Sequence, residues 1–577
     1  MKPRYPLHLV LAGALSALLL CGANANADVV IDGVNADITR AIRANLTLPE
    51  GCGQSDWLVR YRYKNSQREI ETTLQTFGYY SPVIVQQLVF ETKCWKATFH
   101  IDPGPPVTIA SANVAIEGEG KSLPAFTQLL AKSTLKVGNR FEQDSWEATK
   151  SDIERLASRL GFRQGKFVQH KASVDALHDT VAVDLVYDTG PRFHFGSTRF
   201  DTDLFDKSLL DRYVPYTRGE PFDGQKLGQM YQSLLDSGYF DDVIIDTSHV
   251  EGTDIDIRVS LVAARRARSH VGIGFSTDLG PSFSLGREVR RINRRGHQLK
   301  ADLSLSPVQT KFAGSYRIPR SGGIGSWISI YGGTLQEQTE TSKTSNSTLG
   351  IRRVLPRRNG WVETRFLEIA NYRFDVAGQS SSTLTLVPGI NISHTYSDSA
   401  SARPQHAHAL TAELSGTSRV LGSSVDYVSA TGSAKVIQAL TGRIRFIGRS
   451  RIGAVWSNDF DQLPPTTRFF AGGDTSVRGY DYNEIGAVDA AGAVVGGNRV
   501  IEGSAELDFA FHSNWGFAAF LDAGSVSLGH FSGTFERSAG IGIRWYSPIG
   551  PIRFDLAQPL NATDRGVKLH VSLGPDL

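Results

Sequence analysis

Several features that define common protein classes are scarce or missing in this 577-residue chain. Lys and Arg number 61 and Asp and Glu 58, so the net charge is +3, without the strong basic bias of a nucleic-acid-binding protein. No long apolar run occurs after residue 20, which excludes a bundle of membrane-spanning helices. No long polar tract occurs either, which excludes a disordered or collagen-like chain. At about 150 residues per domain, the length predicts roughly four domain-sized units.

The one long apolar run lies at the N-terminus and predicts a signal peptide over residues 1–27. Lys2 and Arg4 supply a positive start, and Leu7–Leu20 forms the apolar centre. Ala25-Asn26-Ala27 then has the small residues of a cleavage site. The mature chain is therefore expected to be exported, either as a soluble protein or embedded in a membrane as strands.

Only three cysteines are present, and one of them lies in the leader. Cys21 would mark a lipoprotein, but Leu20 is bulky where that processing needs a small residue. Cys52 and Cys94 remain, and an even number in an oxidising compartment favours a disulfide. Closing a loop of about 40 residues would contribute roughly 4 kcal/mol. Two buried free thiols are the alternative.

The N-terminal half repeats one pattern three times, which predicts an array of small β-α-α-β-β domains. In each copy a helix with apolar residues at helical spacing ends at a glycine followed by an aromatic residue, and strands follow. The glycines are about 80 residues apart. The three motifs are Gly78-Tyr79-Tyr80, Gly161-Phe162 and Gly238-Tyr239-Phe240. The predicted domains span residues 28–103, 104–190 and 191–264.

Small domains of this kind leave a sheet edge exposed, which suits them to hold an extended peptide by strand addition. Backbone hydrogen bonds then provide affinity without demanding a particular sequence. The alternative is that the repeats are rigid spacers.

From about residue 265 to 577 helical spacing gives way to strict alternation of apolar and polar residues. Leu507 and Phe509, for example, alternate with Glu506 and Asp508. Apolar-out and polar-in alternation is typical of a β-barrel in lipid, although a soluble sandwich would also alternate. Sixteen segments are expected, which start near residues 268, 281, 296, 309, 325, 345, 360, 382, 405, 423, 442, 497, 514, 534, 550 and 566.

Two kinds of connection join these strands. The even-to-odd turns are short and partly basic, as in Arg291–Gly296 and Pro356–Gly360. We expect them to be solvated, with contact to anionic lipid headgroups as the alternative. Among the odd-to-even connections, the one over residues 458–496 stands out by its length. Loops this long are uncommon and are usually functional.

This long loop contains Val477-Arg478-Gly479-Tyr480, and it is expected to fold back into a wide lumen. Arg478 would then need a carboxylate. Glu506 and Asp522 lie on neighbouring strands in the lumen-facing register, and we expect them to be its partners.

Enzymatic and metal sites are not expected. His406 and His408 share one strand face, but a zinc site needs a third or fourth ligand. No nucleophile motif and no phosphate-binding loop are present, so no catalytic residue and no cofactor is predicted.

The Val-Arg-Gly-Tyr motif in a long sixth loop resembles the BamA/TamA superfamily of outer-membrane barrels, and the three repeats resemble POTRA domains. Three such repeats, the barrel start Gly272–Pro281 and the terminus Leu573–Leu577 are most similar to TamA-type members. The terminal Leu577 departs from the aromatic end of most outer-membrane barrels. The resemblance covers nearly the whole mature chain and implies three periplasmic α+β repeats followed by a 16-stranded antiparallel transmembrane barrel.

The same resemblance implies a location in the outer membrane of a Gram-negative bacterium. It implies insertion of other β-barrel proteins, including autotransporters, with a TamB-like partner anchored in the inner membrane and with lipid transport between the membranes. Unfolded outer-membrane proteins would be the clients, and their own folding would supply the driving force. Two rivals remain: a two-partner secretion pore, which usually carries two POTRA domains, and a passive porin, which leaves the repeats and the loop without a role.

The seam between the first and last strands is expected to be weak, and so to form a lateral gate. Glycines on the first strand and a short last strand leave few bonds to close it, and Pro575 cannot donate one. A disulfide from Ile273 to a residue among 569–572 is expected to lock it. The alternative is a permanently closed barrel whose glycines accommodate a bend. The gate residues would be Gly272, Gly274, Leu569, Val571, Leu573 and Gly574.

Overall fold

The computed structural model describes residues 27–574 apart from 92–93, 322, 340–341, 400, 402, 532–533, 548–549 and 562–565. The expected leader lies outside the described residues up to residue 26, and so does Pro575. Among the described residues no helix is both long and apolar enough to cross a membrane.

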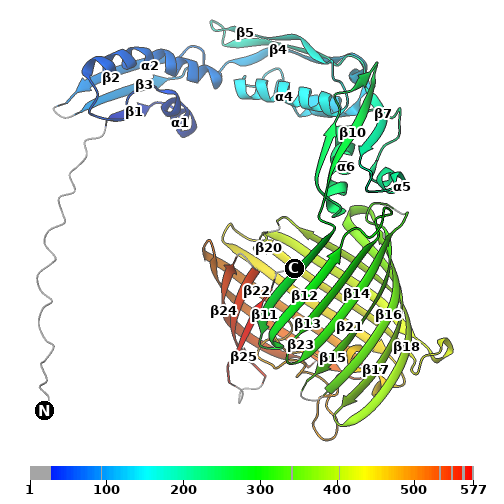
Figure 1. The fold of residues 1–577 in the computed structure, drawn as a ribbon. Helices are drawn as coiled ribbons and strands as arrows, with labels where there is room; N and C mark the ends of the chain where they lie inside the picture. The colour runs from blue at the N-terminus through cyan, green and yellow to red at the C-terminus, as the bar shows by residue number, and fades with distance from the viewer. Residues whose placement is uncertain are drawn as a thin grey trace, which may run out of the picture. The chain divides into compact units, whose positions relative to one another are not determined.

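The first repeat is a three-stranded sheet covered by two helices (Figure 1). Side chains cap the helix starts: Asn35 accepts from the backbone N–H of Ile38 at 3.0 Å, and Ser55 does the same at the second helix. The helices and sheet enclose a core that includes Ile70, Leu74 and Phe99. Its elements are β1 (Asp28–Asp32), α1 (Ala36–Asn45), α2 (Asp56–Thr76), β2 (Val83–Phe90) and β3 (Trp95–Asp102).

A disulfide joins Cys52 and Cys94 within this first repeat. It links the segment before α2 to the start of β3, the central strand of the order β1-β3-β2. Trp95, the next residue, donates its indole N–H to the carbonyl of Gly51 at 3.3 Å. The bridge therefore fastens one helix to the sheet it covers.

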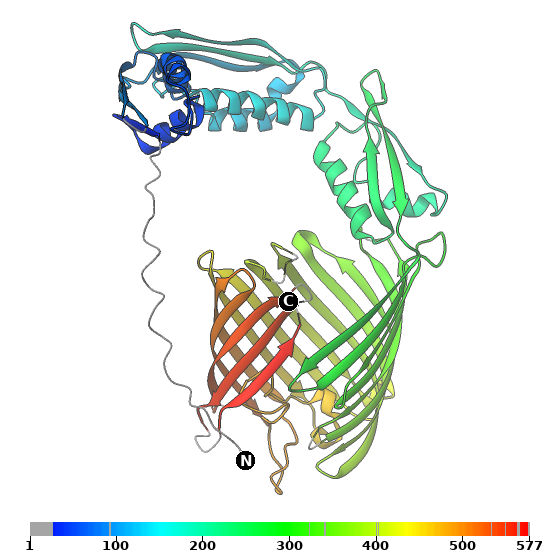
Figure 2. The same cartoon turned by 60° about the vertical axis from the view of Figure 1, so that its left-hand side comes forward.

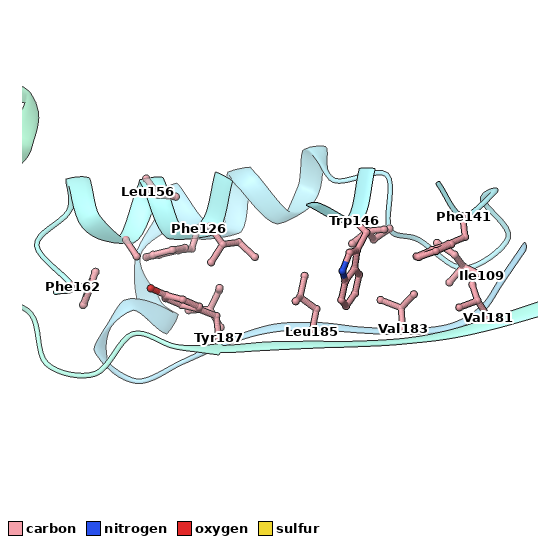
Figure 3. Close-up of a cluster of buried hydrophobic side chains, with 14 of the residues drawn as sticks. Ile109, Phe126, Phe141, Trp146, Leu156, Phe162, Val181, Val183, Leu185 and Tyr187 are labelled. Atoms are coloured by element: carbon pink, nitrogen blue, oxygen red, sulfur yellow. The ribbon is translucent and has the colours of Figure 1, made fainter. Parts of the chain in front are cut away.

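The second repeat has the same order of elements, and its helices pack on one face of the sheet (Figure 3). Trp146 on the long helix and Phe126 on the short one meet Val183 and Leu185 from the central strand. The elements are β4 (Thr108–Glu117), η1 (Glu119–Ser122), α3 (Pro124–Lys132), α4 (Gln143–Arg159), β5 (Lys166–Asp175) and β6 (Thr180–Asp188).

In all three repeats the last long strand lies in the centre of the sheet, with orders β1-β3-β2, β4-β6-β5 and β7-β10-β8. The first strand and the strand after the helices are therefore both edge strands. The third repeat consists of β7 (His194–Asp201), α5 (Lys207–Leu210), η2 (Asp211–Tyr213), α6 (Gly224–Asp236), β8 (Phe240–Asp246), β9 (Val250–Glu251) and β10 (Asp254–Ala263).

Each glycine–aromatic motif bonds to residues at or just after the end of its own repeat. At the middle joint Gly161 has φ +88°, and a Cβ there would lie 2.8 Å from the Cβ of Phe222, so only glycine fits. The motifs thus end the helices as predicted and also form the joints of the array. The three bonds run from Val107 N to Gly78 O at 2.8 Å, from Phe193 N to Gly161 O at 3.0 Å and from Ala264 N to Tyr239 O at 2.9 Å.

The basic turn over residues 291–296 is solvated as expected, with Asn293, Arg294 and Arg295 exposed, but two of its carbonyls are also bound by the third repeat. The Tyr239 hydroxyl donates to the carbonyl of Gly296 at 2.5 Å, and the N–H of Asp206 donates to the carbonyl of Arg294 at 2.9 Å. Burial raises the pKa of Tyr239, so its hydroxyl stays protonated as a donor. Residues 198–215, 227–246 and 258–577 accordingly form one compact unit.

Residues from Ala267 onward form a closed barrel of sixteen antiparallel strands, as the alternation predicts (Figures 1 and 2). Every strand begins within four residues of its predicted start. The strands are β11 (Ala267–Ser276), β12 (Gly280–Val289), β13 (Gln298–Leu305), β14 (Gln309–Pro319), β15 (Trp327–Gln338), β16 (Ser342–Pro356), β17 (Trp361–Val376), β18 (Gln379–Ser397), β19 (His406–Thr417), β20 (Tyr427–Ala439), β21 (Ile444–Trp456), β22 (Arg499–His512), β23 (Trp515–Ser527), β24 (Glu536–Ser547), β25 (Gly550–Pro559) and β26 (Lys568–Leu573).

The two faces of the barrel wall differ as the sequence predicts. Leu507 and Leu521 are exposed on the outer face, whereas Glu506, Asp508 and Asp522 on the same two strands are buried toward the lumen. Acidic side chains therefore line the inner wall beside the long loop between β21 and β22.

Candidate functional site: the sixth loop and the seam

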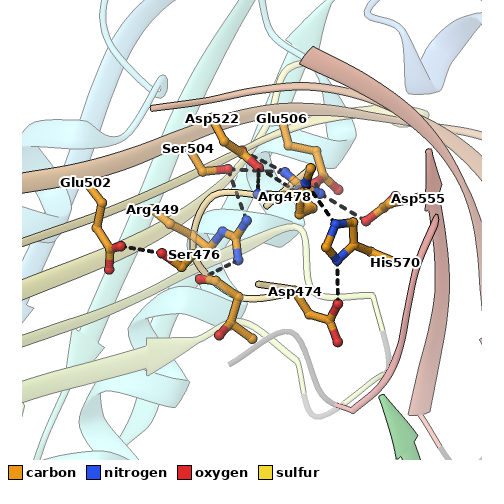
Figure 4. Close-up of polar contacts among 12 residues, drawn as sticks. Arg449, Asp474, Ser476, Arg478, Glu502, Ser504, Glu506, Asp522, Asp555 and His570 are labelled. Atoms are coloured by element: carbon orange, nitrogen blue, oxygen red, sulfur yellow. Dashed lines mark hydrogen bonds and ion pairs between the residues drawn. The ribbon is translucent and has the colours of Figure 1, made fainter. Parts of the chain in front are cut away.

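The long sixth loop, residues 457–498, folds against the inner wall of the barrel (Figure 4). Phe469, Val477 and Tyr480 are buried there in small apolar clusters. Arg468 binds the loop to itself, since its guanidinium donates to the carbonyls of Asp461, Leu463 and Val495 at 2.9–3.0 Å. The loop is thus a packed element of the lumen.

Arg478 lies at the centre of the contact between loop and wall, and its side chain is only 2% exposed. Its Nε and Nη2 donate to the two oxygens of Asp522 at 2.7 and 2.9 Å, which is a bidentate pair. Its Nη1 donates to Glu506 at 2.8 Å and to Asp555 at 3.0 Å. The Cζ atom also lies 3.3 Å from the ring centroid of Phe520, a cation–π contact. The structure thus brings Arg478 to both expected carboxylates and to a third.

A second buried arginine shares these carboxylates. Arg544 donates to Glu506 at 2.9 Å and to Asp555 at 2.5 Å. Two guanidinium groups and three carboxylates from β22, β23, β24, β25 and the loop therefore form one network. Sequence reasoning missed Arg544 and Asp555, although both lie in the polar register of alternating strands.

The residues beside Arg478 have separate roles. Gly479 has φ +94°, and a Cβ there would lie 3.3 Å from Pro559, so the loop can approach the wall only with glycine. The Tyr480 hydroxyl donates to Glu536 at 2.6 Å, and Val477 is fully buried. All four residues of the expected motif therefore contact the barrel wall or pack within the lumen.

The loop also binds both strands that meet at the seam. The carboxylate of Asp474 accepts from the Thr277 hydroxyl at 2.5 Å and lies 2.7 Å from Nδ1 of His570 on β26. Nε2 of His570 accepts from the N–H of Gly479 at 2.8 Å (Figure 4). The proton of the ring therefore lies on Nδ1, which donates to Asp474.

In the described geometry both ring nitrogens of His570 are engaged by the loop. Asp278, Asp474 and His570 bring three ligand atoms within 4.8 Å of one another. A metal-bound histidine donates its second ring N–H to an acceptor. Here Nε2 faces a donor and Nδ1 carries the proton, so His570 offers no lone pair to a metal.

Among the described residues, which end at 574, the seam between the first and last strands is nearly unpaired. β11 pairs with β12 over ten residue pairs, but it pairs with β26 at one, Ser276 with Ser572 (Figure 2). One further backbone bond runs from Thr277 N to Val571 O at 3.0 Å. Ile273 on this edge is 81% exposed, above every other outward-facing isoleucine of the described barrel, because no described residue of β26 lies opposite it.

The expected gate residues occupy both sides of this seam. Gly272 and Gly274 pair with Ser284 and Ser282 on β12. Leu569, Val571 and Leu573 pair with β25, and Gly574 follows β26. The register corrects one detail: Ile273 lies three residues before the single paired position, so no residue among 569–572 faces it. A cavity of about 500 Å³ adjoins the seam on the lumen side, lined by residues that include Gly274, Ser276, Ser572, Asp474 and Arg478.

Two segments of the chain match known protein families. Residues 292–575 match the Omp85 superfamily domain, and residues 28–103 match the POTRA domain described as TamA domain 1. The chain is similar to the outer membrane protein assembly factor BamA of Neisseria meningitidis serogroup B, with 22% identity over 92% of this chain and 75% of that protein. It is 24% identical to BamA of Nitratidesulfovibrio vulgaris over 61% of this chain and 47% of that protein, so it spans less than half of this second relative.

Among solved structures, BamA from Haemophilus ducreyi lacking POTRA domains 1–3 is similar in fold. The TM-score is 0.66 at 17% identity, covering 81% of this chain and 99% of that one. The family matches place the barrel in the outer membrane and the N-terminal domain in the periplasm.

Proposed function

The protein carries an Omp85 superfamily barrel in the outer membrane behind a periplasmic POTRA domain, and from this premise we propose that it inserts other β-barrel proteins into that membrane. The similarity to an outer membrane protein assembly factor supports this class of activity. The TamA-type match of the first repeat supports a TamA-like role, with autotransporters among the clients and a TamB-like protein as partner. The second and third repeats act in this proposal as further POTRA domains.

The observation that carries the proposal is the seam. In lipid an unpaired backbone N–H or C=O costs several kcal/mol, so a strand edge normally pairs fully. β11 pairs ten residues on one side and one on the other. Its free edge is a template for a strand of an incoming client, whose pairing would satisfy those groups at membrane depth.

The chain's other parts serve the same task. The edge strands of the repeats can hold an unfolded client by strand addition in the periplasm. The client's own folding supplies the free energy, so the proposal needs neither a cofactor nor a catalytic residue. Lipids that pass or loosen at the seam are the second class of partner in this proposal.

A chromosomal deletion with plasmid complementation tests the function. Comparison of outer-membrane protein and lipid profiles should show loss of a subset of β-barrel proteins, restored by the wild-type gene. Loss of one secreted protein with unchanged barrel proteins would instead identify a secretion pore, and unchanged profiles would contradict the proposal.

A further inference from the structure

Backbone pairing alone does not account for a closed seam. On this side β11 has a single residue pair with β26, followed by two bonds between Thr277 and Val571, against ten pairs on its other side. Other contacts must hold the two strands together in the described state.

The sixth loop supplies these contacts through one carboxylate. Asp474 is 3% exposed, and its Oδ1 accepts from Thr277, which follows β11, and from His570 on β26. Its own N–H donates to Asp278, in the same turn as Thr277, at 2.8 Å. Asp474 therefore touches both sides of the seam from a loop fixed elsewhere by Arg478.

The attachments of the two sides are unequal. β26 has two further bonds to the loop. Nε2 of His570 accepts from the N–H of Gly479, and Nζ of Lys568 donates to the carboxylate of Asp481 at 2.6 Å. Among the described contacts, the turn after β11 reaches the loop through Asp474, with Gly473 packed against Asp278. Loss of the Asp474 side chain would therefore leave the turn after β11 with its few direct bonds to β26 and the bond from the N–H of residue 474 to Asp278, while the last strand stays bound to the loop.

We infer that Asp474 is the clasp of the seam, a positioning residue of the sixth loop that holds the first strand against the last until a client arrives. This inference rests on the proposed gate. Arg478 fixes the position of the sixth loop in the lumen, and Asp474 lies only four residues before it. The position of the loop therefore also determines whether Asp474 can hold the seam.

Amide hydrogen exchange of the full-length protein in lipid nanodiscs tests the clasp without any client. Asp474→Ala should speed exchange at Thr277 and its neighbours about tenfold or more, the factor for losing a charge-assisted hydrogen bond. Peptides from β22 should keep wild-type exchange. Asp474→Asn should lie between the wild type and Asp474→Ala, since the amide oxygen still accepts from Thr277 and His570 but the amide NH2 replaces the oxygen that accepts from the N–H of Asp278.

A matched control removes a loop contact on one side only. Asp481→Ala breaks the bond to Lys568 and should leave the exchange of Thr277 unchanged. Unchanged exchange in Asp474→Ala, or a uniform rise in all strands, would overturn the clasp. A locked barrel that still inserts clients would contradict the gate while leaving this result intact, so the two failures are distinguishable.

Discussion

At the scale of single residues, the wall of this barrel holds a buried network with two arginines and three carboxylates. Such a network is not by itself a source of stability, because desolvation of each charge offsets much of the attraction. Its effect is positional: with Arg478 bound to Asp522, Glu506 and Asp555, the sixth loop has one place in the lumen.

Removal of Arg478 should therefore be costly. Arg478→Ala leaves Asp522 buried without its bidentate partner and should lower the stability of the barrel by about 3–5 kcal/mol, with loss of client insertion. Arg478→Lys keeps the charge but lacks the planar fork, so it should restore only part of both. Thermal unfolding of the purified barrel in detergent measures the first effect, and insertion of a model client measures the second.

Arg365 provides the control for this experiment. It pairs with Glu363 but is 64% exposed, and Arg365→Ala should change stability by less than about 1 kcal/mol. A fully active and stable Arg478→Lys variant would show that the fork geometry is unnecessary.

The sequence predicted part of this network for a physical reason. Glu506 and Asp522 could be named because a period of two fixes which side chains face the lumen. Asp474 and His570 could not be paired in advance, since one lies in an irregular loop and the other in the last strand, and no periodicity relates them. The bond from Gly479 to His570 depends on a loop path that only the folded chain defines.

At the scale of elements, the strand after the helices is an edge in every repeat, and in the third repeat this strand is β8.

Strand starts in the barrel were predictable to within four residues because turns separate alternating runs. The docking of the turn at 291–296 on the third repeat was not, because a basic, glycine-ended turn looks the same in sequence whether it is solvated or bound.

The role of a single edge strand can be tested by asking whether β8 contacts unfolded clients. A photo-crosslinking residue at Ile244, which is 57% exposed, should trap unfolded clients because an edge strand offers unpaired backbone groups. The same probe at Leu177, 91% exposed in the turn between β5 and β6, should trap few. Mass spectrometry of the adducts identifies the captured proteins. Capture of an inner-membrane-anchored partner alone at Ile244 would reassign this edge to docking.

At the scale of the whole molecule, the fold combines a chain of small edge-bearing sheets with a barrel whose wall has one weak line. Fifteen of its strand junctions are ladders of six or more residue pairs, while the junction of β26 with β11 has one. The central claim is that this line opens laterally during insertion.

The most direct test is a disulfide that locks the seam at its one paired position, Ser276→Cys with Ser572→Cys. Directly opposed residues of antiparallel strands lie within the distance that a disulfide spans. The matched control, Ser284→Cys with Ser304→Cys, joins β12 to β13, which are already paired. The rate of client insertion into lipid vesicles should fall to background when the seam variant is oxidised, recover on reduction, and stay normal in the control. An oxidised seam variant that inserts clients at the wild-type rate would contradict the account.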